Sequence, residues 1–177
     1  SDVIVHKHNG KMSFYPSAPK GFDTEIAVPG RTCLPELGII VSTRILSDSE
    51  LPEINSISAP CINRAASVNS SFMLELTAWA DYNKCEGEVR VRTRRPGDRF
   101  APLGMKGRQK KVKDLLVSMG VPRYYRSFIP LFFSGERIIW VGGFRLSEQF
   151  KVTENTQKVL EIGIEPFLRY RQNYATI

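Results

Sequence analysis

The chain has 177 residues and a mass of 20.0 kDa, which is enough for one ordinary domain or two small ones. Its composition, 42% hydrophobic and 24% charged, is typical of globular rather than disordered proteins. The sequence has no apolar run near the roughly 18 residues of a membrane-spanning helix and no signal-peptide core at its N-terminus, so we expect a cytoplasmic protein with no membrane partner. The net charge of +7 indicates an anionic partner.

Most of the chain is predicted to form short strands separated by turns. The strongest local signal is Asn9-Gly10, a dipeptide that favours a two-residue hairpin turn between strands. Pro29-Gly30 marks a second turn. The predicted strands span residues 3–8, 11–15, 24–28, 39–46, 72–79, 89–94, 129–133, 137–141 and 159–164.

Residues 47–71 have a different composition, with seven Ser, two Pro and few large apolar side chains. They predict a long loop or linker, and we expect it to be mobile. The rest of the sequence shows neither repeats nor the alternation of parallel βαβ units. We therefore predict an α+β fold, in which one or two helices pack on short antiparallel strands and residues 1–177 form one unit.

One clear helix is predicted in the second half of the chain. Its apolar residues Val112, Leu115, Leu116 and Met119 recur at the spacing of one helix face, and Gly120 is placed to end the helix. This face should pack against the sheet. The side chains that we assign to the core are Leu115, Leu116, Trp140 and Phe144.

The cysteines and histidines argue against several kinds of chemistry. Cys33, Cys61 and Cys85 form no Cys-x-x-Cys pair, and their odd number is typical of reduced thiols. The only histidines are His6 and His8, which have no acidic or thiol partner nearby in sequence. We expect no metal site, no His-activated nucleophile and no nucleotide-binding glycine loop. The chain alone is not expected to be a catalyst.

The positive charge is concentrated in residues 90–126. This segment has 12 Lys and Arg against 2 Asp and Glu, whereas residues 1–89 carry a net charge of −4 and residues 127–177 of +1. A charge needed only for solubility would be spread out, and such clustering instead indicates a binding surface. The candidate RNA-binding residues are Arg90, Arg92, Arg94, Arg95, Arg99, Lys106, Arg108, Lys110, Lys111, Lys113, Arg123 and Arg126.

Three of these arginines, Arg90, Arg92 and Arg94, alternate with Val and Thr. On a strand, this alternation places all three on one face. Like charges in a row repel, so the row is favoured where an anionic partner meets it. The alternative interpretation is an ordinary solvated face of a half-buried strand.

A turn and a basic loop follow this row. The sequence Arg95-Pro96-Gly97-Asp98 favours a type II turn, and Asp98 is expected to brace it by pairing with Arg95 or Arg99. Residues 103–111 form a glycine-bearing loop whose backbone amides, with the N-terminus of the helix, are suited to phosphate. The residues assigned to structural turns are Pro96, Gly97, Asp98 and Gly104.

After the helix, Tyr125 lies between Arg123 and Arg126, where it is placed to stack on a sugar or base, although burial is the commoner position for a tyrosine. About six phosphate contacts over this segment would make binding strongly dependent on salt.

A series of motifs in this part of the chain resembles one family. The motifs are residues 91–103 (Val-Arg-Thr-Arg-Arg-Pro-Gly-Asp-Arg-Phe-Ala-Pro-Leu), 104–107 (Gly-Met-Lys-Gly), 110–114 (Lys-Lys-Val-Lys-Asp), 121–123 (Val-Pro-Arg), 129–131 (Ile-Pro-Leu), 138–143 (Ile-Ile-Trp-Val-Gly-Gly) and 151–153 (Lys-Val-Thr). In this order and spacing they resemble the C-terminal domain of bacterial tRNA(Ile)-lysidine synthetase. The resemblance covers about residues 72–165, the motif-bearing core, and more loosely residues 28–46.

The resemblance implies a fold and a function. The fold is a layered, β-sandwich-like arrangement of antiparallel sheets with one or two short helices, also found in a phenylalanyl-tRNA synthetase subunit. In the family, this domain grips the tRNA, chiefly its acceptor stem. A separate N-terminal domain, carrying a Ser-Gly-Gly-x-Asp-Ser loop, adenylylates the wobble cytidine of an isoleucine tRNA, and lysine then displaces AMP to give lysidine.

This sequence has no such loop. The resemblance therefore implies a tRNA-recognition domain with no cofactor of its own, and ATP and Mg belong to the absent catalytic domain. Its implied partners are the isoleucine tRNA and that N-terminal domain. Two other interpretations stay open, namely a general RNA-binding adaptor and a protein–protein interaction module whose basic surface meets an acidic partner. An oligomer is compatible with each of them.

Overall fold

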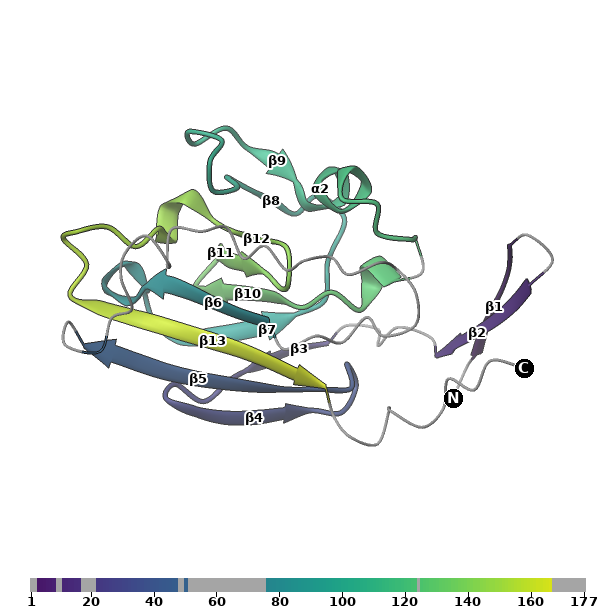
Figure 1. Cartoon of the computed structure of the whole chain (residues 1–177), viewed down its shortest axis with the longest axis horizontal. Helices are drawn as coiled ribbons and strands as arrows, with labels where there is room; N and C mark the ends of the chain where they lie inside the picture. Colours follow the sequence, from purple (N-terminus) through teal and green to yellow (C-terminus); the bar gives the residue numbers. More distant parts are fainter. Residues whose placement is uncertain are drawn as a thin grey trace.

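The computed structural model describes residues 3–8, 11–16, 22–47, 50, 76–123 and 125–166. Two antiparallel sheets pack face to face, and a short hairpin with an α-helix covers the outer face of one of them. Figure 1 shows this hairpin and helix at the top of the view, on the side away from β4 and β5. The predicted α+β class with layered antiparallel sheets is confirmed.

The four-stranded sheet has the strand order β4-β5-β13-β6. Its strands are β4 (Gly30–Leu34), β5 (Ile39–Ser47), β6 (Leu76–Asp81) and β13 (Lys158–Pro166). The two central strands, β5 and β13, pair antiparallel over nine residues each. This long ladder ties the C-terminal part of the described chain to its N-terminal part.

The five-stranded sheet has the strand order β12-β11-β10-β7-β3, and every neighbouring pair is antiparallel. Its strands are β3 (Asp23–Glu25), β7 (Val89–Arg92), β10 (Leu131–Ser134), β11 (Arg137–Val141) and β12 (Arg145–Leu146).

The remaining elements are short. They are the hairpin of β1 (Val3–His8) and β2 (Lys11–Pro16), the hairpin of β8 (Arg99–Phe100) and β9 (Lys110–Lys111), the helix α2 (Val112–Ser118), and the 3-10 turns η2 (Tyr82–Lys84), η3 (Tyr125–Ser127) and η4 (Glu148–Phe150). No helix in the described part of the chain is long and apolar enough to cross a membrane.

The five-stranded sheet is buried on both faces. On β10, Phe132 points into the core between the sheets and stacks on Trp140, with 5.1 Å between ring centroids. Its neighbours Leu131 and Phe133 point to the opposite face and pack against Leu116 of α2 and the residues around it. Successive strand residues alternate between faces, so a run of consecutive apolar residues is what a sheet between two layers requires.

The helix ends where the sequence predicts. Gly120 has a φ of 72°, its N–H donates to the Val117 carbonyl, and the Val121 N–H donates to the Leu116 carbonyl, which is the Schellman arrangement of a helix C-terminus. Met119, expected on the buried face, is instead 45% exposed because the helix has already ended at Ser118.

The other core assignments hold in most cases. Leu115, Leu116 and Trp140 are buried as predicted. Phe144 is only partly buried and packs at the edge of the outer core. The type II turn is supported by the φ of 93° at Gly97 and by the Asp98 N–H bond to the Arg95 carbonyl.

Several strands were missed or shortened in the prediction. The edge strand β4 was not predicted, and neither were the two-residue strands β8, β9 and β12. The strand expected at residues 89–94 ends at Arg92. The turn at Asn9-Gly10 lies outside the described residues, as does the predicted loop at 47–71 apart from Ser47 and Glu50.

Candidate nucleic-acid interface

The basic residues between positions 90 and 126 lie on two neighbouring parts of the fold. One group is on β7 and the turn after it, in the five-stranded sheet. The other is on the β8–β9 hairpin and α2, in the outermost layer (Figure 1). Their side chains meet different partners in the two places, and this difference decides which of them are free to bind an anion.

Arg92 is held inside the protein. The strand register places it opposite Leu131, on the face that the hairpin and α2 cover. Its guanidinium makes two hydrogen bonds to the Asp98 carboxylate, of 2.8 and 2.9 Å, and lies 4.1 Å from the centroid of the Phe133 ring. Because the residue is buried and paired, we withdraw Arg92 from the candidate RNA contacts and assign it a structural role.

The same contacts correct the expected role of Asp98. It braces the turn as predicted, but its side-chain partner is Arg92 rather than Arg95 or Arg99. It also accepts a hydrogen bond from the backbone N–H of Arg95 at 2.6 Å. The carboxylate therefore links the end of β7 to the turn that leads into the hairpin.

Arg90 and Arg95 share one carboxylate. Asp23 of β3 binds Arg90 at 2.7 Å through one oxygen and Arg95 at 2.8 Å through the other. The hydrogen bond and the charge of Asp23 raise the pKa of Arg90, and the charges of Glu136 and Glu25 add to this. Arg90 thus lies among carboxylates, in a setting that would repel a phosphate.

Arg94 is not part of the expected row of three, because β7 ends two residues before it. The residue is half-buried, and its Nε atom is buried without a hydrogen-bond partner among the residues that the structure describes. On β7 itself, only Arg90 and Arg92 lie on the face that is turned toward the hairpin and α2.

The hairpin, the helix and the segment after it carry a second group of cations, which have no such partners among the described residues. These side chains are exposed, and within the described chain none of them makes an ion pair or a hydrogen bond. We call this group the basic surface. It consists of Arg99, Lys106, Arg108, Lys111, Lys113 and Arg123.

The hairpin register concentrates this charge further. Arg99 of β8 lies directly opposite Lys111 of β9. Like charges directly opposite each other destabilise an antiparallel pair. The hairpin is held in place all the same, because Phe100 and Val112 are buried in the outer core and the Val112 N–H donates to the Asp98 carbonyl at 3.0 Å. The fold therefore maintains a charge repulsion that an anionic partner would relieve.

The hairpin loop has an unusual backbone. Gly104, Lys106 and Gly107 all have positive φ, at 88°, 51° and 79°. Lys106 is the only non-glycine residue with positive φ among those described, and such a backbone is uncommon for a side chain of this kind. The assignment of Gly104 to a structural turn agrees with this geometry, and the loop presents Lys106 and Arg108 to solvent.

Two other cations support the local structure. The Lys110 ammonium donates to the Ser118 hydroxyl at 2.9 Å, and the Arg126 Nε donates to the Val121 carbonyl at 2.8 Å. Both residues are half-buried, so we place them at the border of the basic surface. Tyr125 is also half-buried and packs against the outer core, as expected for the commoner position of a tyrosine.

The N-terminus of the helix carries a carboxylate of its own. The helix α2 has only seven residues, and Asp114 lies in its first turn. A helix of two turns has a small dipole, and this carboxylate already occupies the region where an anion would be favoured. The positive potential of this layer therefore comes from its side chains.

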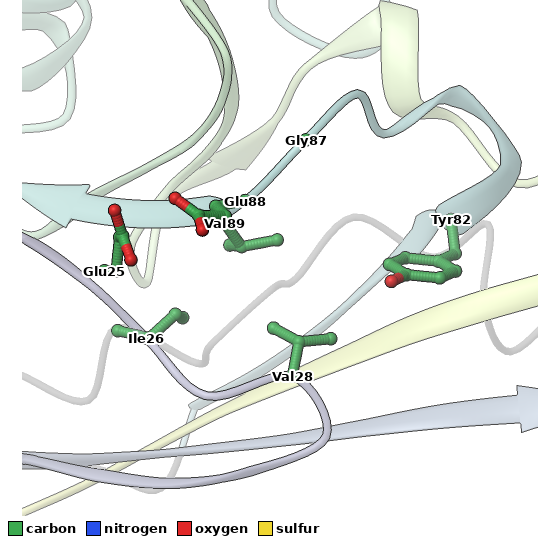
Figure 2. A pocket seen from close by; sticks show the side chains of 7 residues that line it. All are labelled: Glu25, Ile26, Val28, Tyr82, Gly87, Glu88 and Val89. Atoms are coloured by element: carbon green, nitrogen blue, oxygen red, sulfur yellow. The ribbon is translucent and has the colours of Figure 1, made fainter.

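A cavity of about 300 Å³ lies elsewhere, next to β3 and the start of β7 (Figure 2). The carboxylates of Glu25 and Glu88 point toward one another at one side of it. Their hydrogen bond and mutual repulsion raise the pKa of Glu25. This cavity would repel phosphate. Its lining residues are Glu25, Ile26, Val28, Tyr82, Gly87, Glu88 and Val89.

Comparison with known proteins identifies this architecture. Residues 89–164 match the family model described as the TilS substrate C-terminal domain. A solved structure of a TilS C-terminal domain has the same fold, with a TM-score of 0.61 and 24% identity over 83% of this chain and 98% of that one. Residues 89–164 of the chain thus match a TilS C-terminal domain. The resemblance found in the sequence motifs is confirmed.

The relatives that this chain matches are much longer than the chain itself. The tRNA(Ile)-lysidine synthase of Caldanaerobacter subterraneus subsp. tengcongensis is 49% identical over 88 residues, which are 50% of this chain and 19% of that protein. The tRNA(Ile)-lysidine synthase of Symbiobacterium thermophilum is 33% identical over 139 residues, which are 78% of this chain and 25% of that protein. The chain thus matches about a quarter or less of each relative.

The TilS family match contains all twelve candidate residues. Sequence reasoning missed two carboxylates, one that pairs with candidate arginines and one that holds the basic loop. Asp23 lies 67 positions before Arg90, and Glu148 lies 44 positions after Gly104, whose N–H it accepts. No local sequence pattern predicts such pairs, because the residues are far apart in the sequence and only the folded sheet brings them together.

Proposed function

We propose that this TilS domain binds the tRNA substrate of a tRNA(Ile)-lysidine synthase through the basic surface, chiefly at the acceptor stem. The observation that carries the proposal is a set of six exposed cations on the β8–β9 hairpin, α2 and the segment after it, none of which has a side-chain partner among the residues that the structure describes. The names of the relatives point to a tRNA as the substrate, and the exposed Lys and Arg side chains are suited to bind its phosphates.

Lysine and arginine side chains on such a surface contact the sugar-phosphate backbone. Each phosphate contact releases condensed counterions, so the affinity falls steeply with salt. These contacts fix the position of the RNA and carry no direct sequence information. A base-paired acceptor stem is recognised mainly by its A-form shape, to which a fixed arrangement of cations on a rigid layer is suited.

The chemistry of lysidine formation belongs, in this proposal, to the catalytic domain of the parent enzyme, which would use ATP with Mg²⁺ and free lysine in the cytoplasm. The described residues of this chain do not fit ATP. Two carboxylates line the cavity, and nowhere in the described part do three His, Cys, Asp or Glu side chains lie close enough to hold a metal ion. We therefore assign this chain to recognition of the isoleucine tRNA.

A filter-binding comparison tests the proposal with three ligands at one moderate salt concentration. They are the isoleucine tRNA that receives lysidine, an unrelated tRNA and a DNA duplex of similar length. We expect the tRNAs to bind more tightly than DNA, and the isoleucine tRNA most tightly. Equal affinity for all three would support a general electrostatic adaptor instead. Absence of binding to any would support a protein-interaction module.

A further inference from the structure

The basic loop of the β8–β9 hairpin is attached to a segment far from it in sequence. The Leu103 N–H donates to the Leu146 carbonyl at 2.8 Å, and the Glu148 N–H donates to the Ala101 carbonyl at 2.7 Å. Between these bonds, Pro102 forms a β-bridge with Ser147. The chain leaving β8 is therefore bound, residue by residue, to the segment that joins β12 to η4.

One side chain extends this attachment into the loop. The Glu148 carboxylate accepts a hydrogen bond from the Gly104 N–H at 2.8 Å. Beyond Gly104, the hydrogen bonds of the loop within the described chain are those of its own turns, in which the Met105 N–H donates to the Pro102 carbonyl and the Arg108 N–H to the Met105 carbonyl. Residues 104–108 are all exposed, and among the described residues the Glu148–Gly104 hydrogen bond is the last one that joins this loop to the rest of the fold.

We propose that Glu148 is a positioning residue that orients the loop at residues 104–108 so that Lys106 and Arg108 meet the RNA backbone together. The inference rests on the proposed function. A loop held in its bound conformation loses less conformational freedom on binding than a loose one. Through its hydrogen bond to Gly104, the carboxylate makes the two cations a fixed pair.

The charge of Glu148 makes the test decisive. A carboxylate beside a basic loop repels RNA, so a residue acting through charge alone would strengthen binding when neutralised. A positioning residue has the opposite effect, because its loss loosens the loop. We expect Glu148→Ala to weaken tRNA binding about fivefold, in proportion to the cost of immobilising freed side chains. Glu148→Gln keeps a carbonyl acceptor for the Gly104 N–H and should bind at least as tightly as the unaltered chain.

Glu154→Ala provides the matched control. Glu154 is exposed, makes no hydrogen bond or ion pair within the described chain, and carries the same charge. Its removal should leave the affinity unchanged or slightly higher. If Glu148→Ala behaves in the same way as this control, or if Glu148→Gln weakens binding as much as Glu148→Ala, Glu148 does not act by positioning the loop.

A double-mutant cycle separates positioning from a general loss of folding. In a Lys106→Gln/Arg108→Gln background, the loop cations are absent, so Glu148→Ala should produce no further loss of affinity. A further fivefold loss in that background would overturn the proposal, because Glu148 would then act through other parts of the protein.

Limited trypsin digestion tests the attachment without RNA. Trypsin cuts after Lys106 and Arg108, and we expect cleavage at these two bonds to accelerate in Glu148→Ala but not in Glu148→Gln or Glu154→Ala. Unchanged cleavage in Glu148→Ala would show that the carboxylate does not hold the loop. Failure of the unaltered chain to bind tRNA would contradict the proposed function, whereas the cleavage rates report on Glu148 in either case.

Discussion

The strand β7 and the β8–β9 hairpin follow each other in the chain and are both rich in Lys and Arg, yet their charges have different environments. On β7 and the turn after it, Arg90, Arg92 and Arg95 are paired with Asp23 or Asp98. On the hairpin, Arg99 and Lys111 face each other, and neither pairs with a carboxylate of the described chain. The number of cations in a segment therefore overstates the charge that is available to a partner.

The position of each element in the layers explains the difference. The strand β7 lies inside a sheet that is covered on both faces, and an unpaired charge there would be strongly destabilising. The hairpin and α2 form the outermost layer, where cations remain hydrated and need no partner. Burial thus explains why Arg92 is paired, whereas Arg90 and Arg95 are partly exposed and pair with Asp23 because β3 lies beside β7.

The largest expected effect is the loss of the buried pair. Asp98→Ala leaves the Arg92 guanidinium buried without its partner, and removal of one member of a buried ion pair typically costs about 3 to 5 kcal/mol of unfolding free energy. Urea unfolding measures this. Asp114→Ala, on the exposed face of α2, is the matched control and should cost less than about 1 kcal/mol. A loss for Asp98→Ala no larger than the control would mean that Arg92 is not held as described.

The second effect concerns binding rather than stability. We expect Arg99→Gln/Lys111→Gln/Lys113→Gln to weaken tRNA binding by more than about tenfold at moderate salt, since each change removes one candidate phosphate contact. The melting temperature should stay the same or rise, because the variant removes the repulsion between Arg99 and Lys111. A large fall in melting temperature would assign these cations to the fold instead of the interface.

The paired arginines give the contrasting result. Arg90→Gln/Arg95→Gln removes two positive charges from the same 37-residue segment. We expect tRNA affinity to change less than about threefold, because Asp23 already engages both side chains. The unfolding free energy should also change little, since exposed ion pairs contribute only about 0 to 1 kcal/mol to stability. A loss comparable to that of the hairpin variant would show that tRNA displaces Asp23 and that β7 belongs to the interface.

The smallest effect is expected at the acidic cavity. The hydrogen bond and charge of Glu88 raise the pKa of Glu25, so the protonated carboxyl of Glu25 is favoured in the folded state. This contribution to stability is complete at low pH and is lost as the pH rises through the raised pKa. Glu25→Gln should therefore raise the melting temperature slightly at pH 7 and not at pH 4, without altering tRNA affinity. An equal shift at both pH values would argue against the Glu25–Glu88 coupling.

Local sequence patterns predicted those parts of the structure that local interactions determine. The helix end at Gly120, the turn at Gly97 and the apolar strands β10 and β11 follow from spacing and residue type. The strand β4 was missed because it is an edge strand with a mostly polar, half-exposed sequence.

The candidate site was predicted less completely. Alternation on β7 correctly placed Arg90 and Arg92 on one face, but that face is covered by another layer, which the alternation itself does not indicate. The partners Asp23 and Glu148 come from distant segments that only the sheet topology brings near. The sequence therefore locates the basic segment, and the tertiary structure shows which of its cations are paired with carboxylates and which are exposed without such a partner in the described chain.

The central claim is that the unpaired cations, and not the paired ones, carry tRNA binding. The most direct test is the dependence of log affinity on log salt concentration for the unaltered chain, the Arg99/Lys111/Lys113 variant and the Arg90/Arg95 variant. Our account predicts that the hairpin variant has a slope shallower by roughly 2 to 3, in line with three lost phosphate contacts, while the Arg90/Arg95 variant keeps the slope of the unaltered chain. Equal reductions in both variants, or a reduction only in the Arg90/Arg95 variant, would contradict it.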